Sequence, residues 1–163
     1  MSVPVFLGLG SNLDAEQNLR AAVRLLAEQI AIQSVSRVYR SVALAKDGQP
    51  LPDRPDFLNA ALLIETDLPP DRLKVDVLRP IEAQLGRQRP ADDPIRHPID
   101  IDILLYGNQV VDPETLTRAH VALPLADLAP DFVHPTTRKT LAEIAAAFQD
   151  VSGISLVEID LLE

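Results

Sequence analysis

The chain has 163 residues, of which 47% are apolar, and it carries a formal net charge of −9 at pH 7. These values fit one compact domain over residues 1–163 with a real hydrophobic core. The absence of cysteine excludes disulfides, thiolate metal sites and a cysteine nucleophile. The acidic balance offers no broad basic surface to nucleic acid or to an anionic membrane. Because no signal-like segment and no run of 18 apolar residues is found, we expect a cytoplasmic protein.

Helix and strand signals alternate along the first part of the chain. Residues 3–9 form a short apolar run that ends in Gly-Ser-Asn, so we predict a buried strand that leads into a turn. Apolar residues at helical spacing predict a helix over 15–30. Partial alternation predicts two strands, over 32–42 and 57–66.

The second part of the chain repeats this order. Two prolines and a glycine frame a predicted helix over 69–86, and Pro80 is expected to kink or divide it. A strand over 99–106 and a short strand over 109–111 form a predicted hairpin. Three more short elements are predicted: a helical turn at 125–128, a helix over 139–148 and an edge strand over 154–159. The order predicts an α+β fold, a ferredoxin-like βαββαβ sandwich with helices on one sheet face and C-terminal additions.

Two aspartates alternate with apolar residues in the predicted strand over 99–106. Side chains at i and i+2 of a strand share a face, so Asp100 and Asp102 lie about 6–7 Å apart along it. Carboxylates this close repel, and a hard dication such as Mg²⁺ would relieve the repulsion. A solvent-facing polar stripe is the other interpretation, and the alternation alone does not decide between them.

Other motifs allow both a structural and a functional interpretation. Residues 8–12 (Gly-Leu-Gly-Ser-Asn) fit a tight turn better than a phosphate loop, because the Lys of a phosphate loop is missing. Phe57 and Asn59 share a strand face, where they could bind a flat heterocycle or belong to the core. Arg87 and Arg89 could bind phosphate or simply complement a helix C-terminus. Three histidines have no metal-ligand spacing and fit structural positions: His97, His120 and His134.

Taken together, the motifs G-S-N, F-L-N-A-A, I-E-x-x-x-G-R-x-R and I-D-I-D-I-L-L-Y-G resemble one family in order and spacing. This is the 6-hydroxymethyl-7,8-dihydropterin pyrophosphokinase family, which moves diphosphate from ATP to a pterin alcohol in folate biosynthesis. The resemblance spans residues 3–135 and includes the segment 123–135. It implies the ferredoxin-like fold, ATP and a pterin alcohol as partners, no nucleic acid or membrane partner, and a monomer or weak dimer.

The resemblance also implies roles for individual residues. Asp100 and Asp102 would hold two Mg²⁺ ions and, with Arg87, would carry catalysis. Phe57 would stack on the pterin and Asn59 would hydrogen-bond it. The implied nucleotide-binding residues are Glu82, Arg87, Arg89, Arg96 and Arg118.

The chain departs from the family pattern before the aspartate strand. The family usually carries an Arg–Trp pair on a loop and an Arg three places before the first Asp. This chain has Asp93, Pro94 and His97 at these places. Arg96 could substitute with a shift of one residue.

A second departure is a deletion of about eight residues after Thr117. When the chain is aligned with the family forwards from Thr117, His120 matches the His of the family's loop. When it is aligned backwards from residues 123–125, Arg118 matches the loop's Arg, and His120 replaces the Phe that packs on the other face of the pterin. Both readings make His120 a substrate-binding residue and predict weak ATP binding and slow turnover. The alternatives are a pterin-binding paralogue with little ATP chemistry and a diphosphokinase for a different pterin, alcohol or diphosphate donor.

Overall fold

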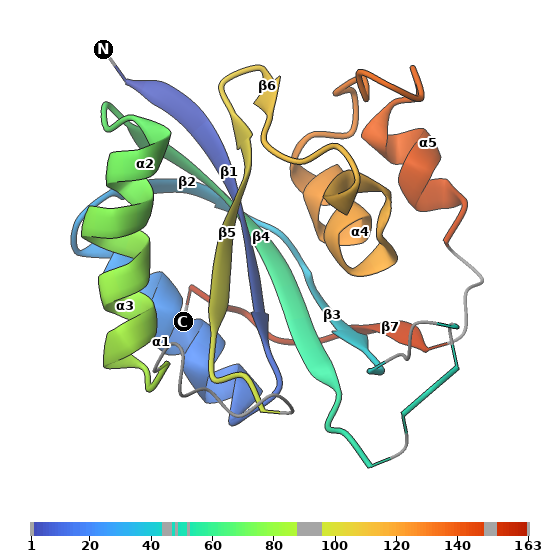
Figure 1. The fold of residues 1–163 in the computed structure, drawn as a ribbon, viewed down its shortest axis with the longest axis horizontal. Coiled ribbons are helices and arrows are strands. Elements are labelled where there is room, and N and C mark those ends of the chain that lie inside the picture. Colours follow the sequence, from blue (N-terminus) through green and yellow to red (C-terminus); the bar gives the residue numbers. More distant parts are fainter. Residues whose placement is uncertain are drawn as a thin grey trace.

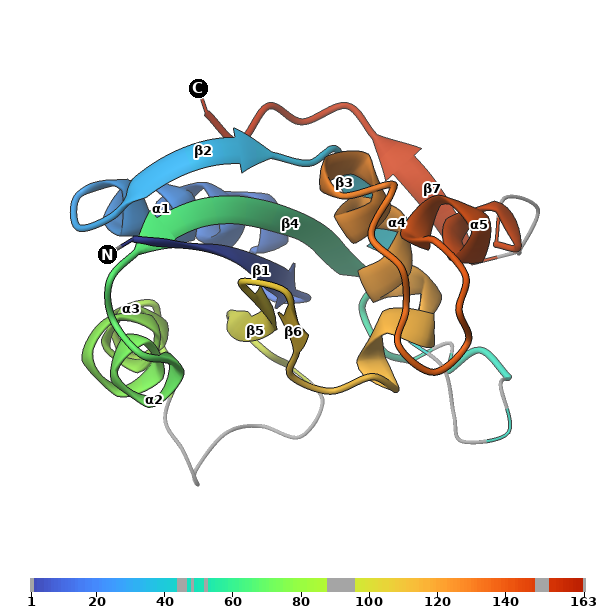
Figure 2. The ribbon, with the colours of Figure 1, turned by 90° about the horizontal axis from the view of Figure 1, so that it is seen from above.

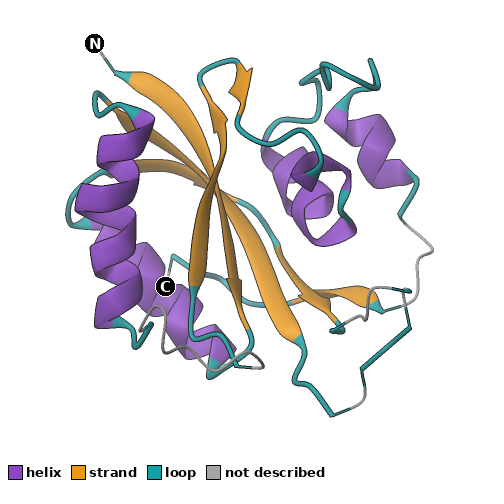
Figure 3. Ribbon diagram, in the orientation of Figure 1, coloured by secondary structure: helices purple, strands orange, loops and turns teal. Residues whose placement is uncertain are grey.

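An antiparallel sheet forms the centre of the molecule, with helices on both of its faces (Figures 1 and 3). The computed structural model describes residues 2–43, 47, 49–51, 53–87, 96–148 and 153–162. The elements, in chain order, are β1 (Val3–Ser11), α1 (Ala15–Ala27), β2 (Ala31–Val35), β3 (Val38–Ser41), β4 (Phe57–Thr66), α2 (Pro70–Leu73), the π-helix η1 (Lys74–Leu78), α3 (Arg79–Gln84), β5 (Asp100–Tyr106), β6 (Gln109–Val110), the 3₁₀-helix η2 (Thr115–Thr117), α4 (Ala119–Leu128), α5 (Leu141–Ala146) and β7 (Ile154–Val157).

The strand order confirms the predicted ferredoxin-like fold. The order is β6-β5-β1-β4-β3-β7, and β2 also pairs with β4. The predicted strand over 32–42 is interrupted at Ser36, whose backbone N–H donates to Ala61 O at 2.9 Å while its Oγ accepts from Ala61 N–H at 2.7 Å. The interruption divides that strand into β2 and β3 along one edge of β4.

Pro80 is accommodated without a break in the second helix. The run α2–η1–α3 is continuous, and the Arg79 N–H donates to Lys74 O in the wider i→i−5 pattern of a π-turn. Proline has no N–H and its ring crowds the preceding turn, and a π-turn gives it room. The predicted kink or division therefore takes the form of a π-helical segment.

The two faces of the sheet carry different layers. Helices α1 and α2–α3 cover one face, which we call the core face, and bury a cluster with Leu7, Leu19 and Leu62. Helices α4 and α5 pack on the opposite face, as Figure 2 shows from above, around a second cluster with Leu105 and Leu125. The prediction of helices on one face thus holds for the ferredoxin-like part and is wrong for the C-terminal additions.

Two local predictions also change. Strand β1 continues through Ser11, so Gly8 and Gly10 lie inside a paired strand and not in a turn. The predicted helical turn at 125–128 is a ten-residue helix that begins at Ala119. Apolar residues are distributed around this helix, so no helical period of apolar residues indicated its length, and Pro124 inside it is a residue that usually ends a helix.

Candidate active site

A cleft of about 1000 Å³ opens on the face of the sheet opposite α1, between the sheet and the start of α4. The strand order places β1 between β4 and β5, so side chains of β4 and β5 stand on either side of a floor formed by β1. The residues of these three strands that line it include Gly8, Gly10, Phe57, Asn59, Asp100 and Asp102. Four of these are predicted site residues: Phe57, Asn59, Asp100 and Asp102.

The aspartate pair stands beside the two glycines of β1. Asp100 pairs with Gly10 and Asp102 with Gly8, so both carboxylates share the cleft face, as their spacing predicted. Desolvation, and then the nearby charge of Asp100, raises the pKa of Asp102 to about 6. The pair is therefore electrostatically strained, and a cation beside it would relieve the strain.

Arg87 is the cation already next to this pair. Its Nη1 donates to Asp100 Oδ1 at 2.8 Å and to Ile99 O at 3.0 Å, and the side chain lines the cleft. Glu82 lies behind β5, only 4% exposed. Its Oε2 accepts from the Ile101 N–H at 2.9 Å and lies 3.9 Å from Arg87 Nη1. Glu82 thus contacts the backbone of the residue between the two aspartates.

Asn59 is held in one orientation on the β4 side of the cleft. It is 4% exposed, and its Nδ2 donates to Tyr39 O at 3.2 Å and to Ser41 Oγ at 2.9 Å. Its Oδ1 is turned toward Gly10, where an added Cβ would lie 3.4 Å away. Sequence reasoning missed Ser41 and Tyr39, because their contact with Asn59 depends on the pairing of β3 with β4.

The Gly-Ser-Asn motif clamps the segment that leads into β5. The Asn12 N–H donates to His97 O at 3.1 Å, and Asn12 Oδ1 accepts from the His97 N–H. The buried Ser11 hydroxyl donates to Pro98 O at 2.6 Å. The motif therefore positions the start of β5, which neither interpretation from the sequence included.

The other predicted residues lie in different settings. Arg118 and His120 line the cleft at the start of α4, and desolvation followed by the charge of Arg118 lowers the pKa of His120. Arg96 is exposed next to His97, and Arg89 lies outside the described residues, as do Asp93 and Pro94.

His134 has the structural role that the sequence predicted. It is buried, its Nδ1 accepts from the N–H groups of Thr136 and Thr137, each at 3.1 Å, and its Nε2 lies 2.9 Å from Pro113 O. A neutral imidazole with Nε2 protonated satisfies all three contacts.

A charged network fixes α4 to the sheet. Asp127 of α4 accepts from Arg37 Nη2 at 2.8 Å and from the Tyr39 hydroxyl at 3.1 Å. Desolvation, and then Asp127, raises the pKa of Tyr39 to about 12, so this hydroxyl stays a donor at neutral pH. The wall of the cleft is thus tied to the same strand that orients Asn59.

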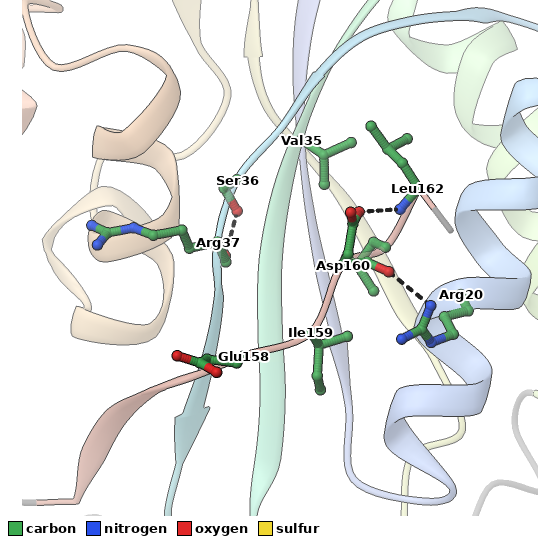
Figure 4. Close-up of a pocket in the computed structure, with 9 residues that line it drawn as sticks. Arg20, Val35, Ser36, Arg37, Glu158, Ile159, Asp160 and Leu162 are labelled. Carbon is green, nitrogen blue, oxygen red and sulfur yellow. Dashed lines mark hydrogen bonds between the residues drawn. The ribbon is translucent and has the colours of Figure 1, made fainter.

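A second hollow, of about 520 Å³, lies beside the C-terminal tail (Figure 4). Its polar groups are paired across the tail: Arg20 Nη1 donates to Asp160 O at 2.7 Å, and the Leu162 N–H donates to Asp160 Oδ1 at 2.9 Å. Leu161 next to them is buried in the core. Residues 158–162 of the tail form part of the lining of this hollow, and none of the predicted site residues lines it.

The fold and the site together define a ferredoxin-like α+β domain with a polar cleft on one sheet face. The family model described as 7,8-dihydro-6-hydroxymethylpterin-pyrophosphokinase matches residues 6–130. The chain therefore belongs to the 7,8-dihydro-6-hydroxymethylpterin-pyrophosphokinase family.

Similar proteins agree with this assignment. The chain is 40% identical to a 2-amino-4-hydroxy-6-hydroxymethyldihydropteridine pyrophosphokinase of Methylorubrum extorquens and 33% identical to one of Haemophilus influenzae. Each match covers 94% of this chain and 98% of the relative. The structure of Plasmodium falciparum HPPK-DHPS with pteroate is similar in fold, with a TM-score of 0.69 at 14% identity. That match covers 91% of this chain and 44% of the Plasmodium chain.

Proposed function

We propose that this chain transfers diphosphate from ATP to 6-hydroxymethyl-7,8-dihydropterin, the reaction of its family in folate synthesis. The pterin hydroxyl oxygen bonds to the β-phosphorus and releases its proton to solvent, the bond from that phosphorus to the α,β-bridging oxygen breaks, and AMP leaves. One observation carries the proposal: Asn59 and Phe57 on β4 face Asp100 and Asp102 on β5 across a glycine floor. A cytoplasmic location and a monomer or weak dimer stay predictions from the sequence.

The aspartate pair fits Mg²⁺ bound together with a triphosphate. Within the described residues, no three or more His, Cys, Asp or Glu side chains gather into a metal site. A site of two carboxylates is nevertheless what Mg²⁺ uses when phosphate oxygens and water complete its shell. The raised pKa of Asp102 supports a pair built for cations. When bound, two Mg²⁺ ions would neutralise charge on the phosphates during transfer.

The β4 side of the cleft supports pterin binding. The donors of the Asn59 amide are engaged by Tyr39 and Ser41, so its Oδ1 is the atom that accepts from an N–H on the heterocycle edge. Phe57 offers an aromatic face beside it. His120, which enters the cleft from α4, contributes as a neutral side chain because its pKa is lowered.

The positive charges support phosphate binding at the β5 side of the cleft and at the start of α4. Arg87 next to Asp100 and Arg118 at the cleft wall are placed to contact phosphate oxygens. Glu82 acts on the nucleotide indirectly, because it contacts Ile101 and Arg87 and lies behind β5. Arg89 and Arg96 keep the nucleotide-binding role that the resemblance implies. This chain lacks the loop arginines that the family usually carries before β5, and it has the deletion after Thr117. We therefore expect weaker Mg-ATP binding than in family members that carry both segments in full.

Product analysis tests the proposal. The protein, ATP, Mg²⁺ and 6-hydroxymethyl-7,8-dihydropterin should yield AMP and pterin diphosphate in equal amounts, with neither product formed when the pterin is omitted. Nucleotide and pterin binding without AMP would favour the pterin-binding paralogue. AMP formation with another alcohol but not with this pterin would favour a diphosphokinase of different specificity.

A further inference from the structure

A group of polar bonds joins the C-terminal part of α4 to the segment 37–39. Tyr39 is only 5% exposed, and its hydroxyl donates to Asp127 Oδ1 at 3.1 Å. Arg37 Nη2 donates to the Tyr39 hydroxyl at 3.0 Å and to Asp127 Oδ1 at 2.8 Å. The backbone N–H and the Nε of Arg37 both donate to Asp127 Oδ2 at 3.2 Å. Both oxygens of Asp127 are therefore held by one short segment, and we call this set of bonds the Asp127 tie.

Asp127 lies on the same side of α4 as two residues that line the cleft. His120, Pro124 and Asp127 are spaced i, i+4 and i+7, and such positions share one face of an α-helix. His120 and Pro124 line the cleft, and Asp127 follows His120 by about 10 Å along the helix axis. The Asp127 tie therefore fixes the rotation of α4 and its slide along the sheet, and with them the place where His120 enters the cleft.

Two features of this chain make the position of His120 depend on the tie. Apolar residues are distributed around α4, so burial of one apolar stripe gives its rotation little definition. Only two residues separate Thr117 from His120, and α4 begins at Ala119. Because His120 belongs to the helix and not to a loop before it, its side chain moves only as α4 moves.

The backbone of Tyr39 contacts the other side of the pterin site. Tyr39 and Asn59 are paired residues of β3 and β4, and the Tyr39 carbonyl accepts from Asn59 Nδ2 at 3.2 Å. One residue thus holds α4 through its hydroxyl and the Asn59 amide through its carbonyl. Tyr39 is not one of the described residues that line the cleft, so its effect on a ligand there is indirect.

We propose that Tyr39 is a positioning residue for pterin binding, which acts through its bond to Asp127 and sets where α4 presents His120 relative to the Asn59 amide. The proposal rests on the proposed function in that the ligand is the pterin and His120 contacts it. Arg37 supports the same role, because it pairs with Asp127 and donates to the same hydroxyl.

A double-mutant cycle of Tyr39→Phe and His120→Ala tests this role. Titration calorimetry measures binding of 6-hydroxymethyl-7,8-dihydropterin at saturating Mg²⁺ and α,β-methylene-ATP, an ATP analogue whose methylene group blocks departure of AMP. Each single change should weaken pterin binding about three- to tenfold, the range for one hydrogen bond. The double variant should bind no more weakly than the weaker single variant, because the hydroxyl acts through His120.

Tyr106→Phe is the matched control. It removes the hydroxyl of the chain's other tyrosine, which donates to Leu68 O at 2.7 Å and has no part in the Asp127 tie. Urea unfolding gives the stability cost of each hydroxyl, while pterin affinity should fall only in Tyr39→Phe. Asp127→Asn keeps an acceptor for the hydroxyl and should retain most of the affinity, whereas Asp127→Ala should match Tyr39→Phe.

Several outcomes would overturn the proposal. Wild-type pterin affinity in Tyr39→Phe, or losses that add in the double variant, would leave the hydroxyl a purely structural contact. Unchanged affinity in His120→Ala would mean that α4 presents nothing to the pterin. An equal loss in Tyr106→Phe would trace to lower stability alone. A wild-type chain that binds no pterin overturns the proposed function and this inference together, whereas each of the other outcomes overturns this inference and leaves pterin binding intact.

Discussion

The two faces of strands β1, β4 and β5 differ in every property that matters for folding and function. The core face is mainly aliphatic, with Val5, Leu7, Leu9, Leu62, Ile64 and Ile101 all buried. Alternate residues of the same strands form the cleft face, which carries Gly8, Gly10, Phe57, Asn59, Asp100 and Asp102. One face is filled and uncharged, while the other is open and holds two repelling carboxylates.

The contrast teaches that rigidity and chemistry are divided between the two faces. Burial of aliphatic side chains on the core face stabilises the strands and fixes their register. That register holds the carboxylates and the Asn59 amide in place on the cleft face. Substitutions on the two faces should therefore separate stability from activity.

The largest expected effect belongs to the aspartate pair. Asp100→Ala should lower the rate of AMP formation by roughly 10³-fold or more, because a group that organises charge at the phosphates is lost. The urea unfolding midpoint should stay near that of the wild-type chain, since the relieved repulsion with Asp102 offsets the lost ion pair with Arg87. Steady-state AMP assays with full activity in this variant would refute the role of the pair.

On the core face, Leu7→Ala should lower the free energy of unfolding by about 3–5 kcal/mol, because Leu7 is fully buried. Urea titration measures this change. The fraction that remains folded should bind pterin with wild-type affinity. Weaker pterin binding in step with lost stability would show that the two faces are not separable.

Asn59→Ala should weaken pterin binding by about 1–3 kcal/mol, because the polar edge of the heterocycle loses its partner. Calorimetry with the pterin and the ATP analogue measures the loss. A double-mutant cycle with Ser41→Ala should show coupling, since Ser41 orients this amide. Equal pterin affinity in wild type and variant would remove Asn59 from the site.

The smallest effect concerns the charge of Asp102. Its pKa rises from 3.8 to about 6 in the folded chain, so the folded state is penalised once the carboxyl ionises. The penalty is absent below about pH 4, develops as pH rises to about 6, and persists above. Asp102→Asn should therefore stabilise the ligand-free protein at pH 7–8 by roughly 0.5–1 kcal/mol, reduced by solvent screening.

Thermal melts of both proteins at pH 4 and pH 8 measure this difference. The gain should be present at pH 8 and absent at pH 4. A gain of equal size at both values would trace to packing and not to the charge of Asp102.

Much of the cleft face could be predicted from local patterns. The alternation of Asp100 and Asp102 with isoleucines, and of Phe57 with Asn59, places each pair on one face because strand geometry has a period of two. The resemblance to the family supplied the roles. The core face followed in the same way from aliphatic alternation.

Contacts between distant segments could not be predicted in this way. The clamp of Asn12 on His97 joins residues 85 positions apart, and the Ser41 contact with Asn59 depends on the pairing of β3 with β4. The resemblance assigned Glu82 to the nucleotide. The structure instead shows its carboxylate bonded to the backbone N–H of Ile101 in β5, a contact that depends on the packing of α3 against β5. The length of helix α4 was underestimated because apolar residues are distributed around the helix and Pro124 lies inside it.

The central claim is that the heterocycle and the metal ions share one cleft across β1. β4 and β5 flank β1, so Asn59 and Asp100 stand about 10 Å apart in the sheet. With Mn²⁺ in place of Mg²⁺ and α,β-methylene-ATP present, the 6-hydroxymethyl protons of bound pterin should show strong paramagnetic broadening, and Asp100→Asn should reduce it sharply. Pterin that binds with unbroadened signals, or with broadening unaffected by Asp100→Asn, would place the two partners in separate sites and contradict the account.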